Sequence, residues 1–334
     1  MCQTLIAGPS PYGQLKPLPT ALPSPEELAS APLHAVDLPW LRAAKVQLAV
    51  LRLDLIDPVL SGNKWFKLIR HLHAAREAGA TGVISLGGPH SNHLHALAAA
   101  ASRYGLRSVG LLRGHPQQTP TVEDLQQFGM QLHWLGYGGY RERHQPGFFE
   151  NWRERYPDHY CIPEGGGGLA GALGCVCLVK AVQDKVAELG WTDHDGWWLA
   201  AGTGTTLAGL AIGEAEQGAR RLYGALAGPP AHGVAQQIDQ LLSEAGVTYS
   251  NYQLIDASRG GFGRFDVETV CFIAETEAVT GWPLDPVYTA KALMALRVEV
   301  ERGTFPQGAR LIFVHTGGLQ GRRAAEAQLD TLLR

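Results

Sequence analysis

Short apolar segments followed by glycine-rich turns and helical patterns recur along this 334-residue chain, and this alternation restricts the fold more than any other feature. The β-branched run 82–86 breaks at Gly87-Gly88-Pro89 and continues as an alanine-rich helical pattern. The apolar run 197–201 likewise leads through a glycine–threonine turn into a helical pattern. Strands that alternate with helices pair in parallel. The chain is therefore predicted to be an α/β protein with open sheets and helices on both faces.

Further strands are expected at 46–54, 108–112, 131–135 and 311–315. The length suits about two domains of roughly 150 residues each. A net charge of -3 gives no basic surface for nucleic acid or an anionic membrane. No stretch reaches the ~18 apolar residues of a membrane span, and the start has no signal-peptide pattern. We expect a cytoplasmic protein that binds a small molecule, with no nucleic-acid or membrane partner.

Ser61-Gly62-Asn63-Lys64 directly precedes an amphipathic helical pattern. The apolar residues of 65–72 recur at i, i+3, i+4 and i+7, so the tetrapeptide is expected at a helix N-terminus. Gly62 allows close approach to the backbone, and Lys64 among apolar neighbours would be desolvated. Desolvation lowers the pKa of a lysine and makes its amine a candidate for imine formation. The alternative is a solvated surface lysine.

The turn at 87–93 is a second candidate site. Ser91 or Asn92 is the expected N-cap of the helix that follows. Free N–H groups at a helix start attract anions, so the turn suits a substrate carboxylate. An ordinary capped turn would have the same residue types.

Metal binding is a weaker interpretation. His90, His93 and His95 are close in sequence, but no carboxylate or cysteine completes a ligand set and the pattern is not HExxH. The cysteines are Cys2, Cys161, Cys175, Cys177 and Cys271. Their odd number and irregular spacing indicate neither a disulfide framework nor a zinc site, so no metal is expected.

Two glycine-rich stretches remain. Gly165-Gly166-Gly167-Gly168 is either a backbone surface for close packing or a linker at a domain boundary. Gly202-Thr203-Gly204-Thr205-Thr206 lies between a strand and a helix, where backbone N–H groups, hydroxyls and the helix dipole suit a phosphate. The pattern is neither GxGxxG nor GxxxxGK[ST], which leaves a monophosphate site or a plain loop.

The C-terminal part adds another ligand group. Asp285-Pro286 is expected to open a helix that carries Tyr288, and the strand at 311–315 ends at Thr316. Ligands of open α/β sheets bind at the C-terminal strand ends, so the Thr316 hydroxyl is a candidate. An amine, a carboxylate site, a phosphate site and this hydroxyl together suit pyridoxal 5'-phosphate and an amino acid.

The chain resembles the fold type II pyridoxal phosphate enzymes, in the branch of D-cysteine desulfhydrase and 1-aminocyclopropane-1-carboxylate (ACC) deaminase. The shared motifs, in order, are SGNKWFKL (61–68), GGPHSNH (87–93), PEGGGGLAGALG (163–174), GTGTTLAG (202–209), DPVYTAKA (285–292) and HTGGLQG (315–321). Together they are far more specific than any one alone. The proline-rich residues 1–40 lie outside the resemblance.

The resemblance implies a tryptophan synthase beta-like fold, with the cofactor in the cleft between two α/β domains. A small domain at 61–164 would be inserted in a large domain formed by 1–60 and 165–334. Relatives are homodimers, so a homodimer is implied as well.

The resemblance also implies roles for individual residues. The catalytic residues it implies are Lys64, which would form the Schiff base, Ser91, which would face the substrate Cα, and Tyr288. The cofactor-binding residues are Lys64, Asn63, Gly202, Thr203, Gly204, Thr205, Thr206 and Thr316. The substrate-binding residues are His90, Ser91, Asn92 and Phe262. Asn63 would contact the ring oxygen and Thr316 would lie near the pyridine nitrogen, while His90 replaces a glutamine common in relatives.

Two departures from the family pattern affect the substrate. ACC deaminases have a glutamate directly after the active-site tyrosine, where this chain has Thr289. Without that carboxylate the ring is a weaker electron sink, which favours β-elimination over opening of a cyclopropane. Phe262 also replaces a tyrosine of the family's Gly-Tyr-Gly.

The sequence thus predicts a lyase that removes ammonia and a β-leaving group from a small amino acid, with D-cysteine as the first choice. This places the protein in D-amino acid metabolism. The alternatives are ACC deamination, a non-catalytic cofactor-binding protein suggested by Phe262, and a metal-dependent hydrolase that uses the histidines.

Overall fold

The computed structural model describes residues 21–60 and 62–333, so Ser61 and Cys2 lie outside the described residues. The larger sheet has the strand order β1 (Leu33–Val36), β2 (Gln47–Arg52), β10 (Arg310–His315), β7 (Gly196–Ala201), β8 (Arg221–Leu226) and β9 (Tyr252–Asp256). The smaller sheet has the order β5 (Gln131–Trp134), β4 (Arg107–Leu112), β3 (Gly82–Gly87) and β6 (His159–Cys161). Pairing is parallel except between β1 and β2. The predicted α/β class and the expected strands are confirmed.

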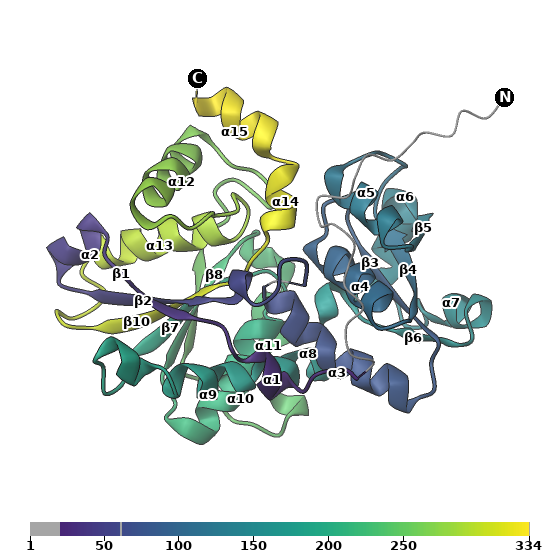
Figure 1. The fold of residues 1–334 in the computed structure, drawn as a ribbon, viewed down its shortest axis with the longest axis horizontal. Helices are drawn as coiled ribbons and strands as arrows, with labels where there is room; N and C mark the ends of the chain where they lie inside the picture. The colour runs from purple at the N-terminus through teal and green to yellow at the C-terminus, as the bar shows by residue number, and fades with distance from the viewer. Residues whose placement is uncertain (1–20, 61, 334) are drawn as a thin grey trace.

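Helices cover both sheets (Figure 1). Those before the return to the larger sheet are α1 (Pro25–Leu28), α2 (Pro39–Ala44), α3 (Asn63–Glu77), α4 (Asn92–Arg103), α5 (Pro120–Gln127), α6 (Gly136–Arg141), α7 (Glu150–Arg155), α8 (Gly168–Cys175) and α9 (Cys177–Gln183). Those after it are α10 (Thr205–Gln217), α11 (Val234–Glu244), α12 (Val267–Thr280), α13 (Thr289–Glu301), α14 (Leu319–Arg323) and α15 (Glu326–Leu333). Short 3₁₀ turns lie at Leu53–Leu55, Glu142–His144, Glu164–Gly166, Val186–Leu189 and Pro230–His232.

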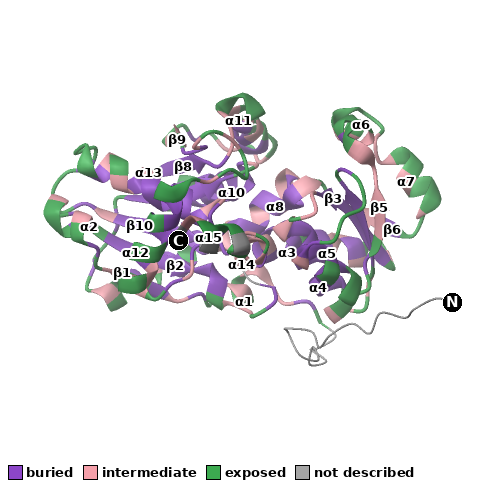
Figure 2. Ribbon diagram, turned by 90° about the horizontal axis from the view of Figure 1, so that it is seen from above, coloured by how far each residue is buried: buried purple, intermediate pink, exposed green. Residues whose placement is uncertain are grey.

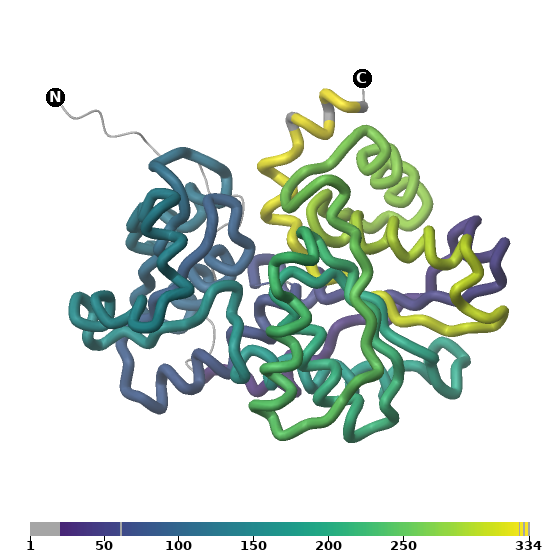
Figure 3. Tube along the Cα trace, turned by 180° about the vertical axis from the view of Figure 1, so that it is seen from behind, coloured from purple at the N-terminus to yellow at the C-terminus, as the bar shows by residue number. Residues whose placement is uncertain are grey.

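The molecule has two lobes, one around each sheet, and the chain leaves the first to build the second. Figure 3 shows the N-terminal purple segment and the green-to-yellow segment in one lobe and the blue-to-teal segment in the other. The chain forms β1 and β2, then the smaller sheet, and then returns with β7. The smaller lobe is therefore inserted in the sequence between two parts of the larger lobe. The boundaries at 61 and 164 stay a prediction.

The larger sheet is buried on both faces, which explains why its strands are continuously apolar. Trp197 and Trp198 are neighbours on β7 and pack into separate cores on opposite faces, as successive residues of a strand must. The Trp197 indole N–H donates to Glu214 Oε1 at 2.7 Å, and that of Trp198 donates to the Ala292 carbonyl at 2.7 Å. Each buried indole therefore has a hydrogen-bond acceptor.

Helices α3 and α8 pack against each other where the two lobes meet, and α3 is largely buried there (Figure 2). A Cβ on Gly174 of α8 would lie 2.0 Å from the Phe66 carbonyl oxygen of α3, so only glycine permits this approach. The run 165–167 is also buried. Of the two interpretations of the four glycines, close packing is confirmed for 165–167.

The helix expected to open at Asp285-Pro286 begins later, at Thr289. The Asp285 carboxylate accepts hydrogen bonds from the backbone N–H groups of Val287, Tyr288 and Thr289 at 3.0, 2.7 and 2.9 Å. This side chain replaces the first helical turn with a capped turn, because it satisfies the N–H groups that a helix start leaves free.

Candidate active site

Four turns that the sequence analysis identified meet between the two lobes. They lie at 62–64, 87–93, 202–206 and 316–318. The backbone N–H of Gly62 donates to the Leu53 carbonyl at 2.8 Å, and that of Asn63 donates to the Thr316 carbonyl at 3.2 Å. Gly62 has φ +79, and a Cβ there would lie 2.4 Å from the Thr316 oxygen. The start of α3 is therefore seated on the end of β10, and this contact fixes the backbone of Lys64.

Lys64 lies in the first turn of α3, as predicted, and is partly exposed. Burial by the surrounding protein lowers its pKa from the usual lysine value. Lys67 is 1% exposed, and its pKa is lowered well below the usual value by burial and by the neighbouring charge of Lys64. Burial thus makes the protonated form of both amines unfavourable. Each amine is therefore expected to be neutral or to bind an anion that compensates its charge.

Lys67 is a site residue that the sequence reasoning missed. Its Nζ donates to the Thr203 hydroxyl at 3.2 Å, so its acceptor in the described structure is a neutral group rather than a carboxylate. The sequence did contain a signal, because residues three apart on a helix lie on the same face and Lys67 follows Lys64 by three. A buried ammonium group that donates to one hydroxyl can still bind an anion, because buried charges are normally paired.

The turn at 202–206 has the expected strand–turn–helix geometry. Gly204 is the N-cap of α10 with φ +74, and the hydroxyls of Thr203 and Thr205 lie 2.9 Å apart. The Asn63 amide donates to the Thr206 hydroxyl at 2.9 Å, which ties this turn to the start of α3. Hydroxyls, free helix N–H groups and the Lys67 ammonium therefore surround one place that fits a phosphate group.

The turn before α4 has Ser91 as its N-cap. The Ser91 Oγ accepts a hydrogen bond from the Leu94 N–H at 3.2 Å, and Gly87 leaves room for this side chain, since a Cβ there would lie 2.5 Å from Oγ. Asn92 Oδ1 accepts from the Gly321 N–H of α14 at 3.1 Å. Ser91 thus retains its own proton for donation. The side-chain oxygen of Asn92, in contrast, already accepts a hydrogen bond from the other lobe.

Tyr288 and Phe262 form an aromatic pair next to the 202–206 turn. Their ring centroids are 5.8 Å apart at an interplanar angle of 72°. Tyr288 lies against Gly202, where a Cβ would be 3.3 Å from its ring, and burial raises the pKa of its phenol. Phe262 is 52% exposed. Both aromatic residues therefore lie on the same side of the site.

Thr316 and Thr289 occupy different surroundings. Thr316 is buried at the end of β10, beside the Lys64 turn. The Thr289 hydroxyl donates to Asp285 Oδ2 at 2.6 Å. The hydroxyl that follows Tyr288 in the sequence thus stabilises the capped turn at Asp285.

The three clustered histidines do not converge. His93 is buried against the Ser85 hydroxyl, with 2.7 Å between Nε2 and Oγ, whereas His95 Nε2 lies 3.0 Å from Asp124 Oδ2. His90 is exposed, and its pKa is lowered by partial burial. Within residues 21–60 and 62–333, no group of His, Cys, Asp and Glu side chains is arranged to hold a metal ion.

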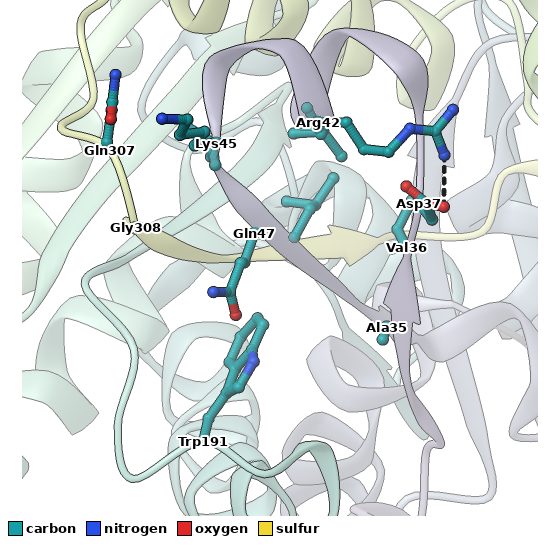
Figure 4. Close-up of a pocket in the computed structure, with 12 residues that line it drawn as sticks. Ala35, Val36, Asp37, Arg42, Lys45, Gln47, Trp191, Gln307 and Gly308 are labelled. Carbon is teal, nitrogen blue, oxygen red and sulfur yellow. Dashed lines mark hydrogen bonds and ion pairs between the residues drawn. The ribbon is translucent and has the colours of Figure 1, made fainter.

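A hollow of about 550 Å³ lies elsewhere, beside α2 and the start of β2 (Figure 4). It is lined by side chains such as Lys45, Gln47, Trp191 and Gln307. It contains neither Lys64 nor any residue of the four turns, so it is separate from the candidate site.

Comparison with known proteins agrees with this geometry. A family model described as "Pyridoxal-phosphate dependent enzyme" matches residues 28–317. A Pyrococcus horikoshii protein provisionally named a 1-aminocyclopropane-1-carboxylate deaminase is 31% identical over 280 residues, covering 81% of this chain and 84% of that protein. The mitochondrial bifunctional D-cysteine desulfhydrase/1-aminocyclopropane-1-carboxylate deaminase of Arabidopsis thaliana is 28% identical over 354 residues, covering 97% and 85%.

Solved structures give the same fold. The structure titled as an ACC deaminase homologue matches with a TM-score of 0.79 at 29% identity, covering 91% of this chain and 94% of that one. A hydrogen sulfide-producing enzyme from Fusobacterium nucleatum matches with a TM-score of 0.65 at 11% identity, which supports the fold alone. No helix within the described residues is long and apolar enough to span a membrane.

Proposed function

The chain belongs to the pyridoxal-phosphate dependent enzymes, and we propose that it is a lyase that removes ammonia and a β-leaving group from a small amino acid, D-cysteine first. The observation that carries this proposal is the pair of lysines on α3, Lys64 with its lowered pKa and Lys67, which donates to Thr203 in the turn before α10. A depressed amine pKa and an anion site within one helix turn suit a phosphorylated aldehyde.

The residues present fit the cofactor. Thr203, Thr205 and Thr206 would bind its phosphate together with the N–H groups at the start of α10 and the Lys67 ammonium. Gly202 and Gly204 would let the phosphate approach the backbone. Lys64 would supply the amine that attaches the cofactor. When bound, the cofactor supplies an electron sink for the charge left at the substrate Cα.

Further site residues act on the ring and the substrate. Asn63 and Thr316 would orient the ring from the start of α3 and the end of β10. The α4 start, with Asn92, would bind the substrate carboxylate. Phe262 and Tyr288 would form the wall on the opposite side.

Proton transfer would rest on three groups. The lowered pKa of Lys64 favours a neutral amine, which can accept the Cα proton. Ser91 would hold or donate a proton at its Oγ, because that oxygen already accepts the Leu94 N–H. His90, with its lowered pKa, is a neutral group beside Ser91 that can take up a proton.

D-cysteine is the preferred substrate because the site favours elimination. A hydroxyl, Thr316, stands at the strand end near the proposed ring position, and the Thr289 hydroxyl is used by Asp285. Neither protonates a pyridine nitrogen as a carboxylic acid would. Loss of hydrosulfide needs only removal of the Cα proton and a good leaving group. Deamination of ACC is the second candidate, favoured by the names of several relatives.

A substrate panel tests this choice. We expect purified holoenzyme to release pyruvate, sulfide and ammonia from D-cysteine, and to turn over ACC more slowly. Steady-state assays of keto acid, ammonia and sulfide with D- and L-amino acids measure both. Efficient turnover of ACC with none of D-cysteine would overturn the substrate choice. Cofactor binding without turnover of any amino acid would favour a non-catalytic binding protein.

The phosphate site gives a separate prediction. Removing the hydroxyls of Thr205 and Thr206 together should weaken cofactor retention by more than the ~1 kcal/mol of one neutral hydrogen bond, because bonds to a charged phosphate are stronger. Equilibrium dialysis followed by absorbance measures retention. A matched control, Thr192→Ala, removes a hydroxyl on the surface of the same lobe. Unchanged retention in the double variant would contradict the placement.

The remaining expectations concern context. We propose that 61–164 forms a small domain inserted in a large one formed by 1–60 and 165–334. We further propose a cytoplasmic homodimer that acts in D-amino acid metabolism. The free cysteines among the described residues, Cys161, Cys175, Cys177 and Cys271, support the compartment. The family resemblance supports the dimer.

A further inference from the structure

Lys291 is a buried charged residue with no place in the proposed mechanism. It lies on α13 and is 1% exposed. Its Nζ donates to the backbone carbonyls of Ser258 at 2.7 Å and Gly261 at 3.0 Å. Its acceptors are therefore carbonyl dipoles rather than carboxylates, and burial lowers its pKa. Mere filling of space would not require an ammonium group here, because an apolar side chain of equal length avoids the desolvation cost.

The two carbonyls belong to a tight loop after β9. Arg259, Gly260 and Gly261 have φ values of +47, +84 and +136, a left-handed path that turns both carbonyls toward Lys291. On its outer side the loop is held by the ion pair between Arg259 and Asp266, with 2.8 Å between Nη2 and Oδ2. Lys291 thus holds the loop from inside the protein through its bonds to the two carbonyls. A strained backbone conformation of this kind is stable only when surrounding contacts maintain it.

The loop carries Phe262, the aromatic partner of Tyr288. Phe262 is 52% exposed, and its ring packs against that of Tyr288. Lys291 follows Tyr288 by three residues at the same helix start. The start of α13 therefore positions both aromatic residues. Tyr288 is its N-cap, and Lys291 in its first turn holds the loop that carries Phe262.

We propose that Lys291 is a positioning residue that sets substrate specificity by holding Phe262 against the site. This inference rests on the proposed function, in which Phe262 and Tyr288 form the wall beside the substrate. The Phe262 ring has no hydrogen-bonding group. It therefore favours a β-substituent that is apolar or bears sulfur, such as the thiol of D-cysteine, over the hydroxyl of D-serine.

Lys291→Met in the holoenzyme tests the inference. The variant keeps the length of the side chain and removes its donors. We expect the preference for D-cysteine over D-serine, as a ratio of kcat/KM, to fall about ten-fold, the size of one lost apolar contact. The change should lie mainly in KM. Trypsin cleavage after Arg259 or Arg264 should become about ten-fold faster, because bonds from a charged donor hold the closed loop.

Two further variants distinguish the effect of loosening the loop from the effect of losing the Phe262 ring. Phe262→Ala, which removes the apolar ring, should lose the same preference while trypsin cleaves at the wild-type rate, since the loop keeps its anchor. Gly261→Ala strains the backbone at φ +136, while its Cβ would meet nothing closer than the Arg264 side chain at 3.6 Å. It should reproduce both effects of Lys291→Met without altering the core, and it carries the test if Lys291→Met does not fold.

A wild-type cleavage rate together with a wild-type substrate preference, in either loop-loosening variant with cofactor bound, would overturn the proposal. Failure of the proposed function looks different: the wild-type protein itself would turn over no amino acid. In that case the cleavage rates of Lys291→Met and Gly261→Ala still decide whether Lys291 holds the loop.

Discussion

Replacing Lys64 with alanine should abolish turnover of every amino acid, by ~10³-fold or more, in a protein that stays folded. The substitution removes both the amine that attaches the cofactor and the proposed proton acceptor. Stability should not fall, because burial lowers the pKa of Lys64 and makes its protonated form unfavourable in the folded state. The unfolded chain binds that proton more tightly, so losing the amine removes a destabilising contribution at neutral pH, below the unfolded pKa.

Borohydride reduction and peptide mapping provide the measurement. Wild-type holoenzyme should be yellow and carry the reduced cofactor on the peptide containing Lys64. The matched control is Lys67→Ala, on the same helix face. That variant should bind the cofactor more weakly, since Lys67 faces the phosphate turn through Thr203, but should still be labelled on Lys64 at saturating cofactor. A label on Lys67 or Lys291 in the wild-type protein would show that the assignment is wrong.

The sequence predicted the parts of the fold that depend on neighbouring residues. The strand, turn and helix around 82–101 follow from a β-branched run, a glycine turn and an apolar helical pattern, and Ser91, one of the two expected residues, is the N-cap. The turn at 202–206 likewise lies between β7 and α10. Local propensity and tertiary packing agree in these segments, so a single sequence is enough.

Contacts between distant segments could not be predicted in the same way. Asn92 is 229 residues from its hydrogen-bond partner Gly321, and the motif containing Asn92 gave no sign that α14 would contact it. Lys291 reaches a loop about 30 residues earlier in the chain. The role of Lys67 depends on Thr203, which the three-dimensional packing of α3 against the other lobe brings near. Nothing in the local pattern of these segments specifies such partners.

The late start of α13 shows a different limit. A proline in the first turn is a good helix-start signal, but the Asp285 carboxylate competes for the same N–H groups and forms a capped turn instead. Deciding between the two requires the burial of Asp285, whose side chain is enclosed by the fold.

Ser91→Ala should lower turnover of D-cysteine by ~10²–10⁴-fold, the usual effect of removing one acid–base group, while the yellow cofactor remains bound to Lys64. The reason is geometric. The Ser91 Oγ accepts the Leu94 N–H at the start of α4, so this bond does not use the hydroxyl's own proton. A serine is a poor base at its ordinary pKa, and the neutral amine of Lys64 or the adjacent His90 must activate it. Stopped-flow absorbance should still detect substrate binding in the variant.

Loss of the N-cap alone would also destabilise α4, by ~0.5–2 kcal/mol, and this effect must be separated from catalysis. Ser24→Ala removes a comparable cap from α1, where the Ser24 hydroxyl accepts the Glu27 N–H at 3.2 Å. That variant should lose a little stability and no turnover. Thermal unfolding and kcat of both variants, measured side by side, separate the two effects. Full activity in Ser91→Ala would remove Ser91 from the mechanism and leave Lys64 as the sole base, because a cap that can be lost without a change in rate has no part in the chemistry at the substrate Cα.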